Sequence, residues 1–143
     1  FNHGITITAL FLAVSFLEKR LHSTELSAGG GLSKSATQLC WFTMLFVLAS
    51  IAVPGTNNFI GELLILFGVF SLNIWWAVLL GLSLIFSCAY MLRFMHKLFF
   101  GPERVRIEDL TGNERAAFIV LSIFILWLGV YPSVALNLIQ AKS

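Results

Sequence analysis

The second of the chain's long apolar runs is interrupted by a short break, and an ionisable side chain follows it. The break combines two residues that disrupt a helix with three polar ones: Pro54, Gly55, Thr56, Asn57 and Asn58. Lipid cannot satisfy the backbone groups that such a break frees, so it persists only where protein or water surrounds it. Glu62, the only acid within an apolar run, would cost about 2.5–3.5 kcal/mol at the centre of a bilayer. This pattern is typical of an ion or proton path, although a kinked helix with a hydrogen-bonded glutamate would share it.

Glu62 is predicted to lie one turn inside a second half-helix that begins at Asn58. The free N–H groups at a helix start carry roughly half a positive charge and favour a carboxylate, whereas burial disfavours it. A carboxyl group under both influences can exchange protons near working pH, as a proton relay requires. Free carbonyls at the end of the first half-helix, with the polar side chains of the break, could hold ordered water beside it. His3 lies in the first turn of the first apolar run, a position that by itself suggests an interface residue or a hydrogen bonder.

The composition places these residues in a membrane protein. Hydrophobic residues make up 58% of the chain and charged residues 11%, whereas soluble domains are only about 45–50% apolar. The mean hydropathy is +0.90. Cys40 and Cys88 both lie in apolar runs without metal-ligand spacing, so we expect packing residues and neither a metal site nor a disulfide.

Apolar runs cover residues 4–17, 38–70, 74–94 and 116–131. As a single helix the second run would be about 50 Å long, whereas the hydrocarbon core of a bilayer is about 30 Å thick. It therefore forms either one span with an unwound middle or a re-entrant hairpin. The last run is preceded by a capping-box pattern, Thr111-Gly112-Asn113-Glu114, which predicts a helix start.

The basic residues of the connections distinguish the two possibilities. Lysine and arginine occur at Lys19, Arg20 and Lys34 in the first connection and at Arg93, Lys97, Arg104, Arg106 and Arg115 in the last. The turn at 71–73 between them has no basic residue. A single broken span puts both basic connections on the cytoplasmic or matrix side, as the positive-inside rule requires. We therefore predict an all-α polytopic membrane protein with about four transmembrane helices, the second one broken at Pro54-Gly55.

A glycine-rich stretch at residues 28–31 superficially looks like a phosphate-binding loop. Such a loop needs glycine directly before its lysine and a strand before it, but Ser33 precedes Lys34 and the preceding run is helical. We therefore expect no nucleotide binding here. The chain starts at Phe1 inside an apolar run, without a start methionine or a signal-peptide pattern, so we interpret residues 1–143 as part of a longer protein.

The stretch at residues 54–62 resembles the proton-pumping chain M, or chain 4, family of respiratory NADH–quinone oxidoreductase (complex I). Supporting stretches occur in the same order at residues 2–4, 9–11, 20–23, 30–32, 63–68 and 129–132. The resemblance implies that residues 1–143 are the C-terminal helical part of an antiporter-like subunit with a later broken helix. It departs from the family in the connection at 22–25, where a basic residue is lost. The family's upstream lysines also have no counterpart in this sequence, so this chain alone should not pump.

The resemblance also implies roles and partners. Glu62 would be the charged residue of the broken helix, near the outer exit of a proton path, and His3 the intramembrane histidine of the preceding helix. Proton translocation would be coupled to electron transfer from NADH to ubiquinone, in a bacterial or mitochondrial inner membrane. Flavin, iron–sulfur clusters, NADH and quinone would bind to partner subunits, with no cofactor or redox chemistry in this chain. Its partners would be other membrane-arm subunits and the lipid bilayer, not nucleic acid.

Two alternatives remain open on sequence alone. A multisubunit cation/proton antiporter or a membrane-bound hydrogenase would share this fold, although the continuation Gly61-Glu62-Leu63-Leu64-Ile65-Leu66 favours complex I. A purely structural membrane subunit would keep the helices without the chemistry. The presence of both Glu62 and His3 argues against that alternative.

Overall fold

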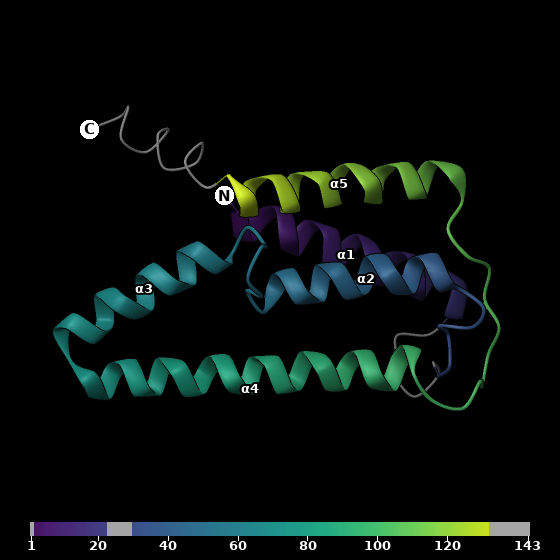
Figure 1. Ribbon diagram of the computed structural model, residues 1–143. Helices are drawn as coiled ribbons and strands as arrows, with labels where there is room; N and C mark the ends of the chain where they lie inside the picture. The colour runs from purple at the N-terminus through teal and green to yellow at the C-terminus, as the bar shows by residue number, and fades with distance from the viewer. Residues whose placement is uncertain (1, 23–29, 132–143) are drawn as a thin grey trace.

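The computed structural model describes residues 2–22 and 30–131, and every regular element in these ranges is a helix (Figure 1). The helices are α1 (Asn2–Leu21), α2 (Thr37–Ser50), α3 (Phe59–Leu72), α4 (Ile74–Phe99) and α5 (Gly112–Val130). The all-α prediction is confirmed. The expected end of the last run at Pro132 and the altered connection at 23–25 lie outside the described residues.

The broken run forms two helices in tandem, since α2 ends at Ser50 and α3 begins at Phe59. At about 1.5 Å per residue each half is about 21 Å long, too short to cross a bilayer core of about 30 Å alone. Among the described residues, α4 and α5 are long and apolar enough to span a membrane individually. The predicted interruption is therefore confirmed, and α2 and α3 together supply one span.

Both basic connections lie at one end of the molecule and contact each other (Figure 1). The N–H of Ser33 donates to the carbonyl of Phe99 at 3.1 Å, and the N–H of Arg104 donates to the carbonyl of Gly30 at 3.3 Å. The α3–α4 turn at Asn73 lies at the opposite end. This is the arrangement that a single broken span requires and a re-entrant hairpin forbids.

Two helices extend further than the apolar runs indicated. α1 continues through Glu18 to Leu21, and α4 continues past Phe94 to Phe99. Both extensions end in basic residues, Lys19 and Arg20 in α1 and His96 and Lys97 in α4. Cations in the last turn are favourable because they offset the partial negative charge of the helix C-terminus. Hydropathy alone misses such polar last turns.

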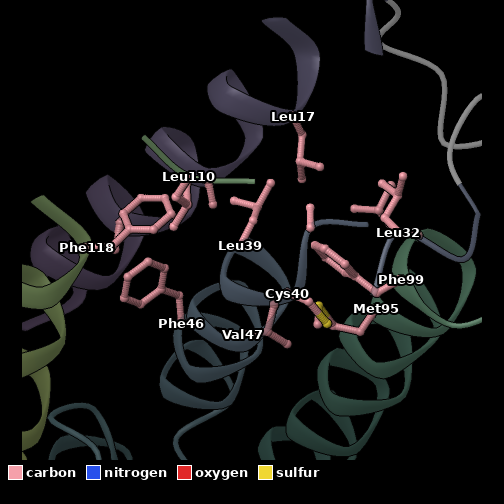
Figure 2. Packing of buried hydrophobic residues seen from close by; sticks show 14 of the residues in the cluster. Leu17, Leu32, Leu39, Cys40, Phe46, Val47, Met95, Phe99, Leu110 and Phe118 are labelled. Atoms are coloured by element: carbon pink, nitrogen blue, oxygen red, sulfur yellow. The ribbon is translucent and has the colours of Figure 1, made fainter. Parts of the chain in front are cut away.

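The core joins α1, α2 and α5, with α4 packed against α2 (Figure 2). Phe118 of α5 is fully buried, and its ring centroid lies 5.5 Å from that of Phe16, 5.5 Å from that of Phe42 and 5.2 Å from that of Phe46. Aromatic pairs at these separations contribute about 0.5–1.5 kcal/mol beyond area burial. α3 buries no residue within the described chain. The break therefore sits where a packed three-helix core gives way to a helix with an open surface.

Candidate functional site

The first half of the break closes α2 with a Schellman motif. The N–H of Val53 donates to the carbonyl of Leu48 at 3.1 Å, and the N–H of Ala52 donates to the carbonyl of Ala49 at 3.3 Å. Ala52 adopts the left-handed conformation that this motif requires, with φ +52°. That conformation costs a residue other than glycine about 1–2 kcal/mol. The carbonyls expected to be free at the end of the first half-helix are thus partly occupied by the chain itself.

The residues after Pro54 form a compact turn. Gly55 has φ +93°, in the left-handed region that favours glycine. Thr56 donates twice to the carbonyl of Val53, from its N–H at 3.0 Å and from its hydroxyl at 2.8 Å. The break is therefore a structured element in which local hydrogen bonds replace the helical ladder.

Asn58 connects the two halves of the broken helix. It occupies the N-cap position, as predicted, and its carbonyl accepts from the N–H of Glu62 at 3.1 Å. Its side chain makes no cap hydrogen bond. The side-chain amide instead donates backwards to the carbonyl of Ala49 at 3.0 Å and to the hydroxyl of Thr6 at 3.4 Å. One buried amide thus satisfies an end of α2 and contacts α1.

Asn57 fastens the break to α1 through a reciprocal pair of hydrogen bonds. The side-chain amide of Asn2 donates to the carbonyl of Asn57 at 2.7 Å, and that of Asn57 donates to the carbonyl of Asn2 at 2.8 Å. The hydroxyl of Thr6 donates to Oδ1 of Asn57 at 3.1 Å. Asn57 is 2% exposed and Thr6 0%. Protein groups therefore satisfy polar atoms for which the sequence suggested water.

The two predicted titratable residues are close in sequence to members of this polar cluster, since His3 follows Asn2 and Glu62 comes four positions after Asn58. Glu62 stands in the first turn of α3 and is partly buried, and His3 is exposed in the first turn of α1. Only the backbone N–H of Glu62 takes part in the hydrogen bonds described above, so neither its carboxyl group nor the imidazole of His3 is a partner in this cluster. The hydrogen bonds between Asn2 and Asn57 thus bring together the starts of α1 and α3, whose first turns carry His3 and Glu62, although nearly sixty positions separate them in the sequence.

A charged cluster at the loop end of the bundle was not predicted. Arg20 donates to Oε2 of Glu114 at 2.5 Å and to the carbonyl of Asp109 at 3.2 Å. The carboxylate of Asp109 accepts from the N–H groups of Gln38 at 2.9 Å and Leu39 at 3.0 Å, and so caps α2 from another segment. The predicted capping box of α5 is present, with the N–H of Thr111 donating to Glu114 at 2.9 Å.

Some residues at the break had a weak sequence signal and others had none. Asn2 and Thr6 are four positions apart, which places them on one face of a helix. Polar residues at that spacing in an apolar helix mark a face turned towards a polar partner. No local pattern identified Ala52, because its importance comes from its backbone geometry.

The family profile described as NADH:quinone oxidoreductase/Mrp antiporter, transmembrane, matches residues 1–88. The structure is similar to a chain of respiratory complex I from Thermus thermophilus with bound NADH, with a TM-score of 0.80 and 34% identity, covering 85% of this chain and 26% of that one. NADH-quinone oxidoreductase subunit M of Rhodobacter capsulatus is 38% identical over 96% of this chain and 28% of its own length. NADH-ubiquinone oxidoreductase chain 4 of Chondrus crispus is 32% identical over 99% of this chain and 30% of its own length.

A helical bundle with one span broken beside a carboxyl group defines an antiporter-like membrane chain. The chain belongs to the NADH:quinone oxidoreductase/Mrp antiporter transmembrane family, and it is an integral inner-membrane protein. It spans a little over a quarter of the length of the relatives, for example 28% of the Rhodobacter capsulatus protein.

Proposed function

We propose that residues 1–143 are the C-terminal helical part of a proton-translocating membrane-arm subunit of respiratory NADH:ubiquinone oxidoreductase. Proton movement through this subunit is coupled to electron transfer from NADH to ubiquinone in the complex. The relatives named as subunit M and chain 4 support this proposal over nearly the whole chain. The observation that carries it is the position of Glu62 in the first turn of α3, directly after a break that Asn57 ties by hydrogen bonds to the first turn of α1, where His3 lies.

In this proposal the chain contributes proton binding and release. The carboxyl group of Glu62 takes up a proton at one oxygen and passes it on towards the outer face, and the imidazole of His3 holds or receives a proton on the same path. The break positions Glu62 by fixing where α3 begins. Electron transfer takes place on NADH, flavin, iron–sulfur clusters and quinone in partner subunits, so the enzyme is the assembled translocase.

Glu62→Gln in the intact complex tests the proposal. Glutamine keeps the shape and hydrogen-bonding capacity but cannot titrate, so proton transport should fall at least about tenfold while assembly stays near wild type. Glu108→Gln is the matched control, since Glu108 is an exposed acid in the connection before α5. Glu62→Asp should lose less activity because it retains an acid. Proton transport and quinone reduction near wild type in Glu62→Gln would leave Glu62 as a structural residue.

His3→Ala tests whether both groups serve one path. If they do, the loss of proton-transport rate in the double variant His3→Ala/Glu62→Gln should be smaller than the sum of the losses in the two single variants. Each loss is expressed as a free energy of activation. Fully additive losses would place the two groups on separate paths.

A cation/proton antiporter is the second candidate, because the family description includes the Mrp antiporters. The named relatives favour complex I. Purification of the native assembly decides between the candidates: co-purifying flavin and iron–sulfur subunits support complex I, and their absence with sodium-dependent proton exchange supports the antiporter.

A further inference from the structure

The backbone of α5 comes close to the backbone of the break at Gly129. A Cβ atom at Gly129 would lie 2.3 Å from the carbonyl oxygen of Gly55 and 2.6 Å from the carbonyl carbon of Thr56. Contacts below 3.0 Å essentially never occur for real Cβ atoms. Both neighbours are backbone atoms, so no side-chain rotation can relieve the overlap. Only glycine at position 129 allows this approach.

Gly129 continues the buried face of α5. Phe118, Ser122 and Ile125 are buried and precede it at the three- and four-residue spacing of one helix face. This face packs against α1 and α2 along the core. The same rigid helix that carries the aromatic core therefore ends directly against the break.

The break is thus held from two directions. α1 holds it through the hydrogen bonds of Asn2 and Thr6 with Asn57, and α5 limits its position by direct backbone contact at Gly129. To restore an ordinary Cβ contact of 3.4 Å or more, the Gly55–Thr56 peptide or the end of α5 would have to move by about 1 Å. A shift of the break by that amount would stretch the adjacent hydrogen bonds of Asn57 and Asn58, now 2.8 and 3.0 Å, beyond the usual hydrogen-bond range.

We propose that Gly129 is a positioning residue for proton transfer at Glu62. The assignment rests on the proposed function of the Glu62–His3 pair. α5 sets where the break lies, the break sets where α3 begins, and the first turn of α3 carries Glu62. A displacement of about 1 Å between reacting groups is enough to cost up to about a hundredfold in rate.

The test compares Gly129→Ala with Gly112→Ala in the intact complex. Gly112 opens the same helix, and a Cβ there would meet no atom within 4 Å. Gly129→Ala should lower proton transport per assembled complex at least about tenfold and shift its pH profile, whereas Gly112→Ala should change neither. A role in packing alone would reduce the amount of assembled complex but leave transport per complex and its pH profile unchanged.

The double variant Gly129→Ala/Glu62→Gln separates this proposal from the proposed function. If Gly129 acts through Glu62, adding Gly129→Ala to Glu62→Gln should cause no further loss of transport. Wild-type transport per complex in Gly129→Ala, or complete failure to assemble in that variant alone, overturns the positioning role even where Glu62→Gln is inactive. Wild-type transport in Glu62→Gln overturns the proposed function itself.

Discussion

Different kinds of polar interaction hold the three-helix core of α1, α2 and α5 together at its two ends. At the loop end, the guanidinium of Arg20 binds Glu114, and the carboxylate of Asp109 caps α2. At the break end, the hydrogen bonds are made by neutral groups, such as the amide of Asn57 and the hydroxyl of Thr6. A charged group near water keeps much of its hydration. Burying a charge without a partner costs far more free energy than burying a hydrogen-bonded amide.

This difference clarifies the role of Glu62. α2 is capped by a carboxylate at its start and by neutral groups at its end, from the backbone of Ala52 and the side chain of Asn58. The break therefore needs no charged residue for its own structure. The presence of an acid beside it, in a position where burial is costly, supports the proton exchange proposed for Glu62.

Removing the side chain of Asn57, which makes hydrogen bonds between the break and α1, should have the largest effect on stability. Asn57→Ala removes the amide group that donates to the backbone carbonyl of Asn2 and the amide oxygen that accepts from the hydroxyl of Thr6, and both bonds are at least partly buried. Leaving buried polar groups unpaired should cost about 2–3 kcal/mol. Thermal disassembly of the purified complex should occur at a clearly lower temperature than for Asn113→Ala, an exposed asparagine in the first turn of α5. Equal midpoints for the two variants would show that the amide cluster does not hold the break.

The loop end should respond more weakly and in a salt-dependent way. Arg20→Ala removes the ion pair with Glu114, whose side chains are 14% and 18% exposed, and the bond to the carbonyl of Asp109. We expect a loss of about 1–2 kcal/mol, measured as the thermal midpoint of the complex. The neighbouring exposed Lys19 provides the control variant, Lys19→Ala.

Salt distinguishes the two ends more sharply than either variant alone. Raising ionic strength screens a partly exposed ion pair, so the midpoint difference between Arg20→Ala and wild type should shrink at high salt. The difference between Asn57→Ala and wild type should stay constant, because the groups involved are neutral. A salt-dependent Asn57→Ala effect would contradict the comparison.

Sequence reasoning succeeded where the signal was local. Pro54 and Gly55 predicted the interruption, and Thr111 with Glu114 predicted the start of α5. It failed where a partner is distant in the chain: Asp109 caps α2 across about seventy positions, and no propensity or periodicity encodes that contact. It also expected water at carbonyls that the chain caps itself, because the amide of Asn58 was interpreted as a local cap and not as a link to Ala49.

Ala52 offers the smallest and most specific test of the comparison. Among the described residues, left-handed backbone occurs at both ends: the loop end has His22 with φ +50° and Gly31 with φ +64°, and the break has Ala52 with φ +52° and Gly55 with φ +93°. Ala52→Gly should remove about 1–2 kcal/mol of strain and lose about 0.5–1 kcal/mol to the greater freedom of the unfolded chain, for a net gain of about 0.5–1 kcal/mol. The thermal midpoint should therefore rise slightly. In contrast, Ala89→Gly, in the exposed interior of α4, should lower it by the usual helical cost of about 1 kcal/mol. If both variants lower the midpoint equally, Ala52 is not strained and the Schellman motif does not explain how α2 ends. If only Ala52→Gly raises it and proton transport falls at the same time, the strained alanine contributes to holding the break in the position that Glu62 requires.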